Sequence, residues 1–370
     1  MIRLIEHIDE LQTIKEACNA LADNLERPFL RYEWLNFSAR AFYRPHQLKI
    51  VVLETRNEVS AVAPLVVAEH NWNGGLELLG TGILPVPSGF LFRDEAALED
   101  LTAAVLKMPL PLHLRGIESG SSEARIFDSS LADSTLAHFQ RRVAIPWMPI
   151  SGSWANYLRQ LSSEKKSCLK TFDQFARSIG EIGIEIDSPS ANRAGILLGE
   201  LQQCERLDSW NQVPASIFLH DRVVPHFSEF VKTLAKSGML RTSVLRLNGD
   251  TGAVHLGLEY AQRLWSLAMF LDRKWYAWSP DALLIHEVIH YAFESRLYSL
   301  EVVDGDRSRL QLSTGLTRKL GDYQICQTQG QAVFALVKEA AQFPTHMFMH
   351  GPSHVSTGKD LESRLSAGGS

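Results

Sequence analysis

The chain has 370 residues, of which 45% are hydrophobic and 21% are charged. This composition is typical of a globular protein and excludes a disordered or fibrous one. The length predicts two domains, because it exceeds what one hydrophobic core usually holds. The 37 basic and 42 acidic residues give a formal net charge of -5, which argues against a nucleic-acid binder that works by neutralising phosphates.

The sequence also predicts a cytoplasmic protein without a membrane span. No apolar run approaches the ~20 residues that cross a bilayer, and the amphipathic, acid-containing start of the chain lacks the apolar core of a signal peptide. The cysteines are far apart and form no C-x-x-C motif, so we expect neither a disulfide framework nor a zinc ribbon. They are Cys18, Cys168, Cys204 and Cys326.

Hydrophobic periodicity in the first half predicts helices followed by a strand pair. The paired strands, 48–55 and 59–69, flank a polar turn at Arg56-Asn57-Glu58. A Ser-rich segment, 119–130, predicts a loop, and we place the boundary between two modules near Gly152. The other predicted elements of this half are helices at 8–23, 30–42 and 95–108 and strands at 76–80 and 112–117.

The second half repeats this order of helices, hairpin and further strand. Its hairpin strands, 240–247 and 253–260, flank an Asn-Gly turn. The next strand, 263–271, is apolar on both faces, so we expect it to be central and buried. The tail 351–370 is rich in Ser, Gly and charge and is expected to be disordered. The remaining predicted elements are helices at 154–180, 191–207, 221–237, 279–297 and 330–342 and strands at 182–187 and 299–305.

The helix predicted at 279–297 has a sharply defined start. Ser279 is its expected N-cap, Pro280 occupies the first helical position and Asp281 lies in the first turn. Because the helix follows a central strand, its unpaired backbone N–H groups and positive dipole end are suited to a pyrophosphate. The alternative is an ordinary capped helix of an α/β domain.

The two halves share a similarity that needs no gaps. When the chain is shifted by 192 residues, residues 48–62 align on 240–254 and both polar turns coincide. The identical positions are Leu48/Leu240, Val52/Val244, Leu53/Leu245, Ala61/Ala253 and Val62/Val254. Together with the repeated order of elements, this similarity predicts a duplicated module.

A series of diffuse motifs recurs along roughly residues 28–315. They are PFLRYEWL (28–35), VSAVAPLVV (59–67), LELLGTG (76–82), the segment 154–180, Ser209-Trp210, the segment 238–260, SPDALL (279–284) and LEVVDGD (300–306). In their order and spacing these motifs resemble the CelD/BcsL-like acetyltransferases, a family related to the FemAB and GNAT acyltransferases. Within 300–306, Glu301, Gly305 and Asp306 fall on the family's acid-x-x-x-Gly-acid pattern.

The resemblance implies an α/β (α+β) protein with a tandem GNAT-like acyl-CoA N-acyltransferase fold, in which two mixed sheets are flanked by helices. Residues 1–150 would form the first module, 151–350 the second and catalytic module, and 351–370 a tail. We predict no capped helix after the hairpin of the first module. That module is therefore expected to serve as a substrate platform or packing partner.

The resemblance also implies acetyl-CoA or another acyl-CoA as the donor, and an amine or hydroxyl of a small molecule or saccharide precursor as the acceptor. The pyrophosphate would bind at the helix start, and the acyl end would lie between strands 263–271 and 299–304. The residues expected at the helix start are Ser279, Pro280, Asp281, Ala282 and Leu283.

The chain also departs from the family pattern. Asp281 stands where the family usually has Gly, and Arg309-Leu310 stand where it has a Tyr-Lys pair. The orthodox signature [Gln/Arg]-x-x-Gly-x-[Gly/Ala] is missing. These departures keep open a non-enzymatic alternative, in which a degenerate pair of GNAT modules acts as a binding module.

Three side chains are candidates to deprotonate the acceptor, because aminolysis of a thioester needs a neutral amine. Strand alternation places His255, Gly257 and Glu259 on one face of the strand 253–260, where they could line a cleft. Glu301, on the strand across that cleft, is the third. The structural alternatives are a satisfied interface histidine and solvated carboxylates.

A zinc-dependent hydrolase is the competing enzymatic hypothesis. His286, Glu287 and His290 match H-E-x-x-H, with both imidazoles on one helix face and the carboxylate placed as a base. The continuation that supplies a third histidine is missing, since Ser295 stands at its place, and the helix lies between sheet strands. We therefore expect no metal, although Glu301 could supply a third ligand, as could Glu294 if it were not too close in sequence to lie on a separate helix.

A basic cluster on the helix 154–180 has two interpretations. Lys165, Lys166 and Lys170 form either a solvated face or a contact for a phosphate-bearing partner, including aminoacyl-tRNA as used by FemAB relatives. The acidic net charge favours the solvated face and argues against nucleic acid as a partner. No pattern in the sequence specifies the oligomeric state.

Overall fold

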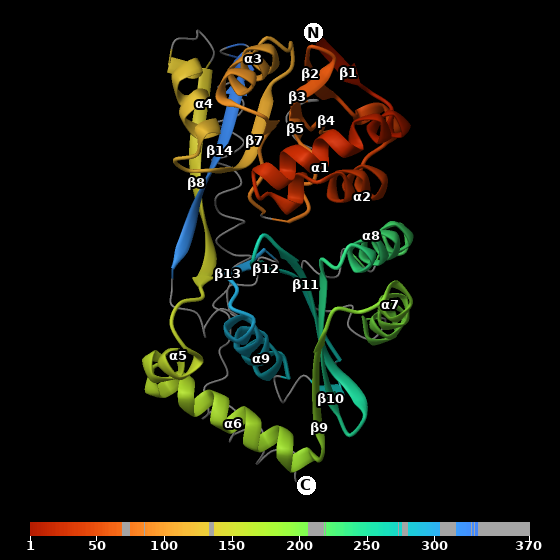
Figure 1. The fold of residues 1–370 in the computed structure, drawn as a ribbon, viewed down its shortest axis with the longest axis vertical. Helices are drawn as coiled ribbons and strands as arrows, with labels where there is room; N and C mark the ends of the chain where they lie inside the picture. Colours follow the sequence, from red (N-terminus) through yellow and green to blue (C-terminus); the bar gives the residue numbers. More distant parts are fainter. Residues whose placement is uncertain are drawn as a thin grey trace.

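The computed structural model contains two α/β halves, which are joined by two long neighbouring strands (Figure 1). Among the described helices, none combines the length and the apolar composition that crossing a bilayer requires. The structure describes residues 1–68, 75–84, 86–132, 137–205, 218, 220–272, 274–275, 280–303, 316–326, 328 and 330–331.

The first half consists of two small sheets and the helices that cover them. Its strands are β1 (Ile2–Ile5), β2 (Ile50–Thr55), β3 (Glu58–Ala63), β4 (Leu65–Val67), β5 (Leu76–Leu78), β6 (Leu91–Phe92), β7 (Leu112–Glu118) and the upper part of β8 (Ala137–Pro149). Its α-helices are α1 (Lys15–Asn24), α2 (Tyr32–Phe42), α3 (Glu95–Leu106) and α4 (Ser122–Ala132), and its 3-10 helices are η1 (Ile8–Ile14), η2 (Pro28–Leu30) and η3 (Pro45–Gln47).

The second half contains one sheet between helices. Its helices are α5 (Trp154–Gln160), α6 (Ser163–Ile179), α7 (Ala191–Glu205), α8 (Val224–Lys236) and α9 (Pro280–Glu294). Its strands are β9 (Ile182–Asp187), β10 (Leu240–Leu247), β11 (Asp250–Tyr260), β12 (Arg263–Leu271) and β13 (Ser299–Val302), and β14 (Thr317–Cys326) comes after them in the chain.

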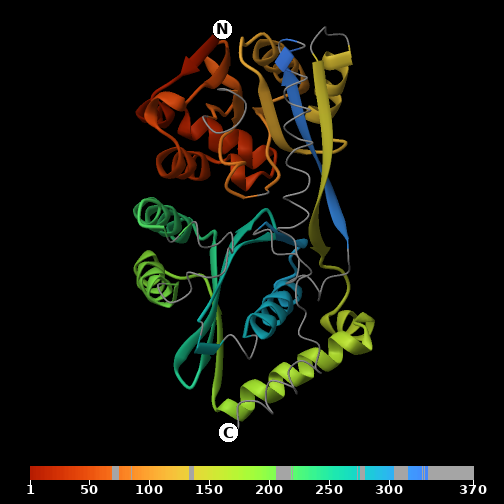
Figure 2. The same ribbon diagram turned by 180° about the vertical axis from the view of Figure 1, so that it is seen from behind.

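A single ten-stranded sheet runs through both halves in the order β4-β5-β7-β14-β8-β13-β12-β11-β10-β9, beside a four-stranded sheet, β1-β2-β3-β6. β14 returns to the first half and pairs with β7 on one side and β8 on the other. β8 pairs with β14 as far as Pro146 and with β13 from Trp147 to Pro149. Figure 2 shows β8 and β14 side by side from behind. β14 therefore lies beyond the predicted module boundary at residue 150 and yet belongs to the sheet of the first half.

The hairpins β2–β3 and β10–β11 have the same register. In each, an irregularity falls at the equivalent position, between Leu53 and Glu54 in the first and between Leu245 and Arg246 in the second. Both turns have two residues with positive φ, as the tightest hairpin turns require. The turn residues are Arg56 and Asn57 in the first hairpin and Asn248 and Gly249 in the second. The alignment by 192 residues thus extends to the backbone, as a duplicated module predicts.

The sheet of the second half separates two apolar layers. Leu264, Met269 and Leu300 pack with α9 on one face, whereas Val254 and Trp265 belong to a core on the other face. That second core also contains α7, α8 and the helices of the first half, so the two halves share it. Figure 1 shows α9 on one side of the strands and α7 and α8 on the other.

Aromatic rings form the centre of this shared core. Phe37 of α2 stacks on Phe230 of α8 with ring centroids 4.9 Å apart. Trp34 contacts the same Phe230 ring at 5.7 Å, and Phe29 contacts Trp265 of β12 edge-on at 5.3 Å. Aromatic pairs of this kind add stabilisation beyond that of the apolar area they bury, so the orientation of the two halves depends on them.

The structure corrects three sequence predictions about the first half. The segment 119–130, predicted to be a loop, forms most of α4. The prediction that the first module lacks a capped helix after its hairpin is wrong, because Asp94 accepts a hydrogen bond from the N–H of Ala97 at 2.9 Å and caps α3. β8 escaped prediction because Pro146 and Pro149 discourage a strand, and Pro146 lies where the strand changes partner.

The predicted strands 240–247, 253–260 and 263–271 and the helices around them are confirmed within a few residues. Some predictions fall outside the described residues. These are most of the helix 330–342, the tail 351–370, Ser209, Trp210, Ser279, Gly305, Asp306, Arg309 and Leu310.

Replacing Phe37 with Ala is expected to lower the free energy of unfolding by about 3–5 kcal/mol, because a buried ring at the centre of the shared core leaves a cavity. Urea unfolding measures the change. Ile196→Ala, at a side chain that is 67% exposed, is the control and should stay within ~0.5 kcal/mol of the parent. A loss below about 1 kcal/mol for Phe37→Ala would contradict a shared core.

Candidate active site

The candidate site lies where the described pairing of two parallel strands of the second half ends. β12 pairs with β13 from Arg263 to Ser266, and the last described bond runs from the N–H of Val303 to the carbonyl of Ser266. β12 continues to Leu271, and within the described residues no strand pairs with this edge after Ser266. An irregularity in the β11–β12 pairing adds a residue on β12 at the same level. We call the region beside this part of β12, beyond the end of its pairing with β13, the wedge.

α9 begins beyond that end of β12 and runs back along the sheet. Pro280 occupies the start of the helix and Asp281 lies in its first turn, as predicted, while Ser279 lies outside the described residues. The first N–H groups of a helix have no partner within it, and its dipole makes this end positive. Ala282 and Leu283 complete this first turn. The carboxylate of Asp281 opposes the binding of an anion there.

His255 is buried under α9 at the base of the wedge. Its Nε2 lies 3.0 Å from the hydroxyl Oγ of Ser266, and the side chain is 0% exposed. Gly257 leaves the room for this pair, since a Cβ there would come within 3.1 Å of the imidazole Cε1 and 2.8 Å of Leu264 Cδ1. The site thus has a buried imidazole–hydroxyl pair on the α9 face.

Glu259 lies at the opposite end of the same strand face. Its Oε2 accepts a hydrogen bond from the hydroxyl of Tyr291 at 2.8 Å and forms an ion pair with Arg241 Nε, also at 2.8 Å. Arg241 Nε donates its hydrogen bond to the same hydroxyl at 2.9 Å. Tyr291 is ten residues after Asp281 along α9, which separates Glu259 from the helix start by about 15 Å. These contacts tie β10, β11 and α9 together.

Glu301 lies on the other face of the sheet. Its neighbour Leu300 packs with α9, so Glu301 faces the first half together with Trp265, its partner in the parallel register. Its Oε1 accepts hydrogen bonds from Ser299 Oγ at 2.8 Å and from Arg318 Nη2 at 2.7 Å. Burial raises the pKa of the Glu301 carboxyl, and the Arg318 guanidinium opposes this only in part.

The three predicted catalytic candidates therefore do not meet in one cleft. His255 lies next to the wedge, Glu259 is remote from it along the same face, and Glu301 lies at its base on the opposite face. Sequence reasoning missed Ser266 and Arg318. Ser266 had a signal, since it is the one hydroxyl in an otherwise apolar strand interior. Arg318 had none, because it is distant in sequence and reaches Glu301 only through the path of β14.

The H-E-x-x-H segment packs against an aromatic ring. The imidazole of His290 stacks on Trp154 with centroids 4.6 Å apart, and His286 lies 4.9 Å from the same ring. Glu287 lies 3.3 Å from His286 Nδ1 and 3.5 Å from His290 Nδ1. In the part of the chain that the structure describes, no third His, Cys, Asp or Glu completes a metal-binding group. The two imidazoles that the zinc hypothesis would use as ligands therefore pack α9 against α5 through Trp154.

The predicted basic cluster lies on α6. Lys166 and Lys170 are exposed and Lys165 is half-buried. Lys166 Nζ donates a hydrogen bond to the carbonyl of Arg159 at 2.9 Å, which supports a local structural role.

The first half contains an equivalent pair of parallel strands whose gap is filled. β5 pairs with β7 only at Leu76 and Glu77, and the segment before β6 then takes its place beside β7. The N–H of Ser88 donates to the carbonyl of Gly116 at 2.8 Å. Gly116 has φ +80°, and a Cβ there would lie 2.5 Å from the carbonyl oxygen of Val86. In the first half, the chain itself thus occupies the position beside β7 after Glu77.

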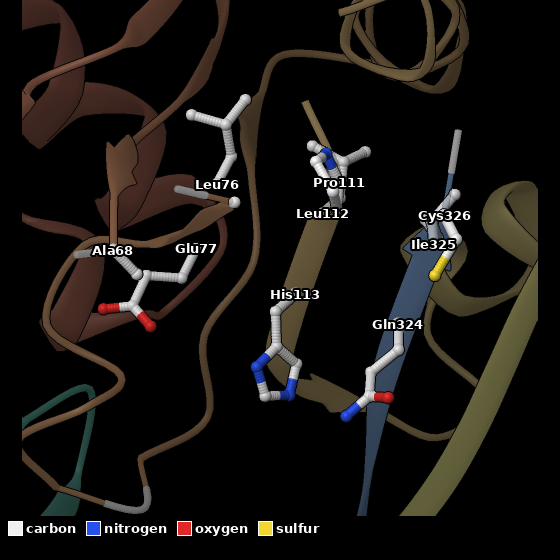
Figure 3. A pocket seen from close by; sticks show the side chains of 10 residues that line it. Ala68, Leu76, Glu77, Pro111, Leu112, His113, Gln324, Ile325 and Cys326 are labelled. Carbon is white, nitrogen blue, oxygen red and sulfur yellow. The ribbon is translucent and has the colours of Figure 1, made fainter. Parts of the chain in front are cut away.

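A small cavity lies at the other end of these strands. It measures ≈ 10 Å³, about the space of one water molecule. Figure 3 shows Glu77, His113 and Gln324 projecting at its edge from β5, β7 and β14. Its size excludes an acyl donor.

Comparisons with known proteins identify the fold. Residues 169–308 match the family model described as the acetyltransferase (GNAT) domain, and this segment contains the wedge and α9. A search of curated proteins returns no match.

Three solved structures are similar over most of the chain. A conserved protein of unknown function from Bacteroides thetaiotaomicron has a TM-score of 0.56 and 10% identity, covering 88% of this chain and 100% of that one. FemX has a TM-score of 0.54 and 10% identity, covering 87% and 98%. L-PGS from Bacillus licheniformis has a TM-score of 0.52 and 14% identity, covering 90% and 95%. At such identities the likeness shows a shared mixed α/β fold over most of the chain, and the family match adds a GNAT-type domain over residues 169–308.

The raised pKa of Glu301 gives the folded protein a defined pH dependence. A carboxyl whose folded-state pKa is raised contributes stability below its unfolded-state pKa, about 4.3, and loses it as the pH rises through the folded value. The parent chain should therefore lose free energy of unfolding relative to Glu301→Gln as the pH rises above about 4.

Urea unfolding at several pH values measures this difference. Glu58→Gln, at an exposed position, is the control and should behave like the parent. The prediction would be contradicted if the free energy of unfolding of the parent rose relative to that of Glu301→Gln as the pH increases.

Proposed function

We propose that this protein transfers an acyl group from acyl-CoA to an amine or hydroxyl of a small molecule or saccharide precursor, with its second half as the catalytic module. The observation that carries the proposal is the wedge between β12 and β13, with α9 beginning beyond it. The match of residues 169–308 to the acetyltransferase domain supports it, because these residues contain both features.

The donor fits the described residues in two ways. Backbone N–H groups of the first turn of α9, at Asp281, Ala282 and Leu283, would hold the pyrophosphate. The wedge would hold the pantetheine arm, because the edge of β12 after Ser266, which has no strand partner among the described residues, offers backbone groups to its amides. The negative charge of Asp281 lowers the affinity of this site for CoA, so substitution of this one residue would change that affinity.

The reaction needs a neutral acceptor and a stabilised oxyanion. Glu301, at the base of the wedge, is placed to accept a proton from the acceptor on the face toward the first half. His255 and Ser266 are placed on the α9 face, where a hydrogen bond could stabilise the developing charge. Glu259 is tied to Arg241 and Tyr291 and is assigned no chemical step.

The first half is proposed to serve as a substrate platform. Its own wedge position is filled by the segment that contains Val86 and Ser88, which supports a non-catalytic role. The proposal for the first half rests on this filled gap. It does not require that the first module lack a capped helix after its hairpin.

Acetyl-CoA and longer acyl-CoAs are expected to raise the melting temperature of the protein, since a ligand present at 100 times its Kd stabilises the folded state by about 2.7 kcal/mol. Thiol release with a panel of amines and alcohols then measures turnover. Stabilisation without thiol release for any acceptor would favour a binding module. No response to any acyl-CoA, together with stoichiometric zinc in the purified protein, would favour the hydrolase.

Asp281→Asn is expected to tighten CoA binding by about two- to fivefold, because removal of one negative charge at the start of a helix is worth ~0.3–1 kcal/mol to an anion there. Titration calorimetry at low salt measures the Kd, and added salt should reduce the gain. Glu287→Gln, which removes a carboxylate farther along the same helix, is the matched control and should leave the Kd within twofold. Weaker binding by Asp281→Asn would refute a pyrophosphate at this position.

A further inference from the structure

The seam between the two halves contains buried polar atoms without hydrogen-bond partners. Among the described residues these include Oε2 of Glu301, Nε of Arg318, Nε1 of Trp265 and Nε of Arg263. The Glu301 side chain is 0% exposed, and Trp265 is 2% exposed. A buried polar group without a partner destabilises the fold, so such groups gathered in one place call for a ligand or another functional explanation.

These atoms belong to side chains that are close together on one sheet face. Trp265 is the register partner of Glu301, and Arg263 is two residues earlier on the same strand. Strand spacing puts Glu301 about 5 Å and Arg263 about 7 Å from Trp265 at the backbone. Arg318 reaches the group from β14, with Nη2 2.7 Å from Glu301 Oε1.

The first half closes this group from the other side. Glu118 of β7 accepts a hydrogen bond from Arg318 Nη1 at 2.8 Å, and Glu26 accepts one from Arg263 Nη2 at 3.2 Å. Phe29 packs on the Trp265 ring. Polar side chains of both halves thus meet at the seam, beside the paired residues of β12 and β13, with Glu301 and Trp265 buried and Glu118 and Glu26 partly exposed.

The chemistry of the unpartnered atoms specifies a ligand. One carboxylate oxygen accepts hydrogen bonds, and three N–H groups donate them. A primary ammonium group satisfies Glu301, and a carboxylate satisfies N–H donors of Arg318, Trp265 or Arg263. An amine or an alcohol alone would leave the donors unpaired, so the set is complementary to a zwitterion with both groups on one carbon.

We propose that the acceptor is a free α-amino acid, whose ammonium group binds Glu301 and whose carboxylate binds the N–H donors of the seam. This inference rests on the proposed acyltransferase function and assigns its acceptor class. The first half then contributes directly to acceptor binding, because Glu118 and Glu26 orient the two arginines.

The transfer step is balanced with these groups. The Glu301 carboxylate takes one proton from the ammonium, and the neutral nitrogen attacks the thioester carbonyl. The C–N bond forms and the C–S bond breaks, and a second proton leaves the nitrogen and neutralises the CoA thiolate. Burial raises the pKa of Glu301, which brings the carboxyl closer to the basicity that a proton acceptor needs.

The test compares three compounds with the same side chain in the presence of CoA. Each of the common L-amino acids is compared with its decarboxylated amine and its N-acetyl derivative, and the change in melting temperature is measured. At least one free amino acid should stabilise the protein at concentrations where both of its derivatives, each lacking one charged group, do not. Equal responses to the amine and the amino acid would overturn the proposal.

Variants locate the site. Glu301→Gln should raise the Kd of the responding amino acid at least tenfold, since a hydrogen bond to a charged group is worth ~1.5–3 kcal/mol. Glu77→Gln, at a buried carboxylate of the first half, is the matched control and should leave that Kd unchanged. The response of each variant to acetyl-CoA shows that it is folded. Binding that survives Glu301→Gln would place the acceptor elsewhere.

The same samples separate the two proposals. Stabilisation by acyl-CoA without stabilisation by any amino acid contradicts the acceptor assignment and leaves the acyltransferase function intact. Stabilisation by an amino acid without any response to acyl-CoA supports the seam site and contradicts the donor.

Discussion

The pairing of β14 between β7 and β8 is the constraint on which the rest of the structure depends. Without it, the two halves would contact each other mainly through side chains of the shared aromatic core. With it, one hydrogen-bonded sheet runs from the first half to the second, and β8 connects the two by changing partner at Pro146. The same strand carries Arg318 to the base of the wedge, so the backbone that joins the halves also builds the proposed site.

The two halves share a hairpin but differ in the strands and segments after it. Their registers agree residue for residue, including the irregularity before the turn. In the second half the described pairing of the third strand with its parallel neighbour covers four residues, and in the first half a returning segment lies beside β7 at Gly116. A few residues of connecting chain thus occupy the space beside β7 in the first half.

The charged side chains of the seam are costly to bury, and they lie at the proposed acceptor site. Glu118, Arg318 and Glu301 form a charged chain across the two halves, although desolvation raises the pKa of Glu301. Buried ion pairs of this kind contribute little net stability, since the cost of removing the charges from water offsets their attraction. Their placement at the end of the β12–β13 pairing is better explained by a polar ligand than by stability of the fold.

The sequence by itself determined the local elements and the fold class. The alternation along 240–271, the Asn-Gly turn and the Pro280 helix start specify strand, hairpin and helix through interactions within a few residues, and the similarity at a shift of 192 residues indicated the duplication.

Only the tertiary structure decided which candidate residues lie close together. Strand alternation put His255 and Glu259 on one face, but the path of α9 placed Glu259 at its far end, and the register of β13 put Glu301 on the opposite face. Arg318 joins Glu301 because β14 crosses between the halves, and such pairing depends on hydrogen bonds between residues far apart in the chain, which no local pattern encodes.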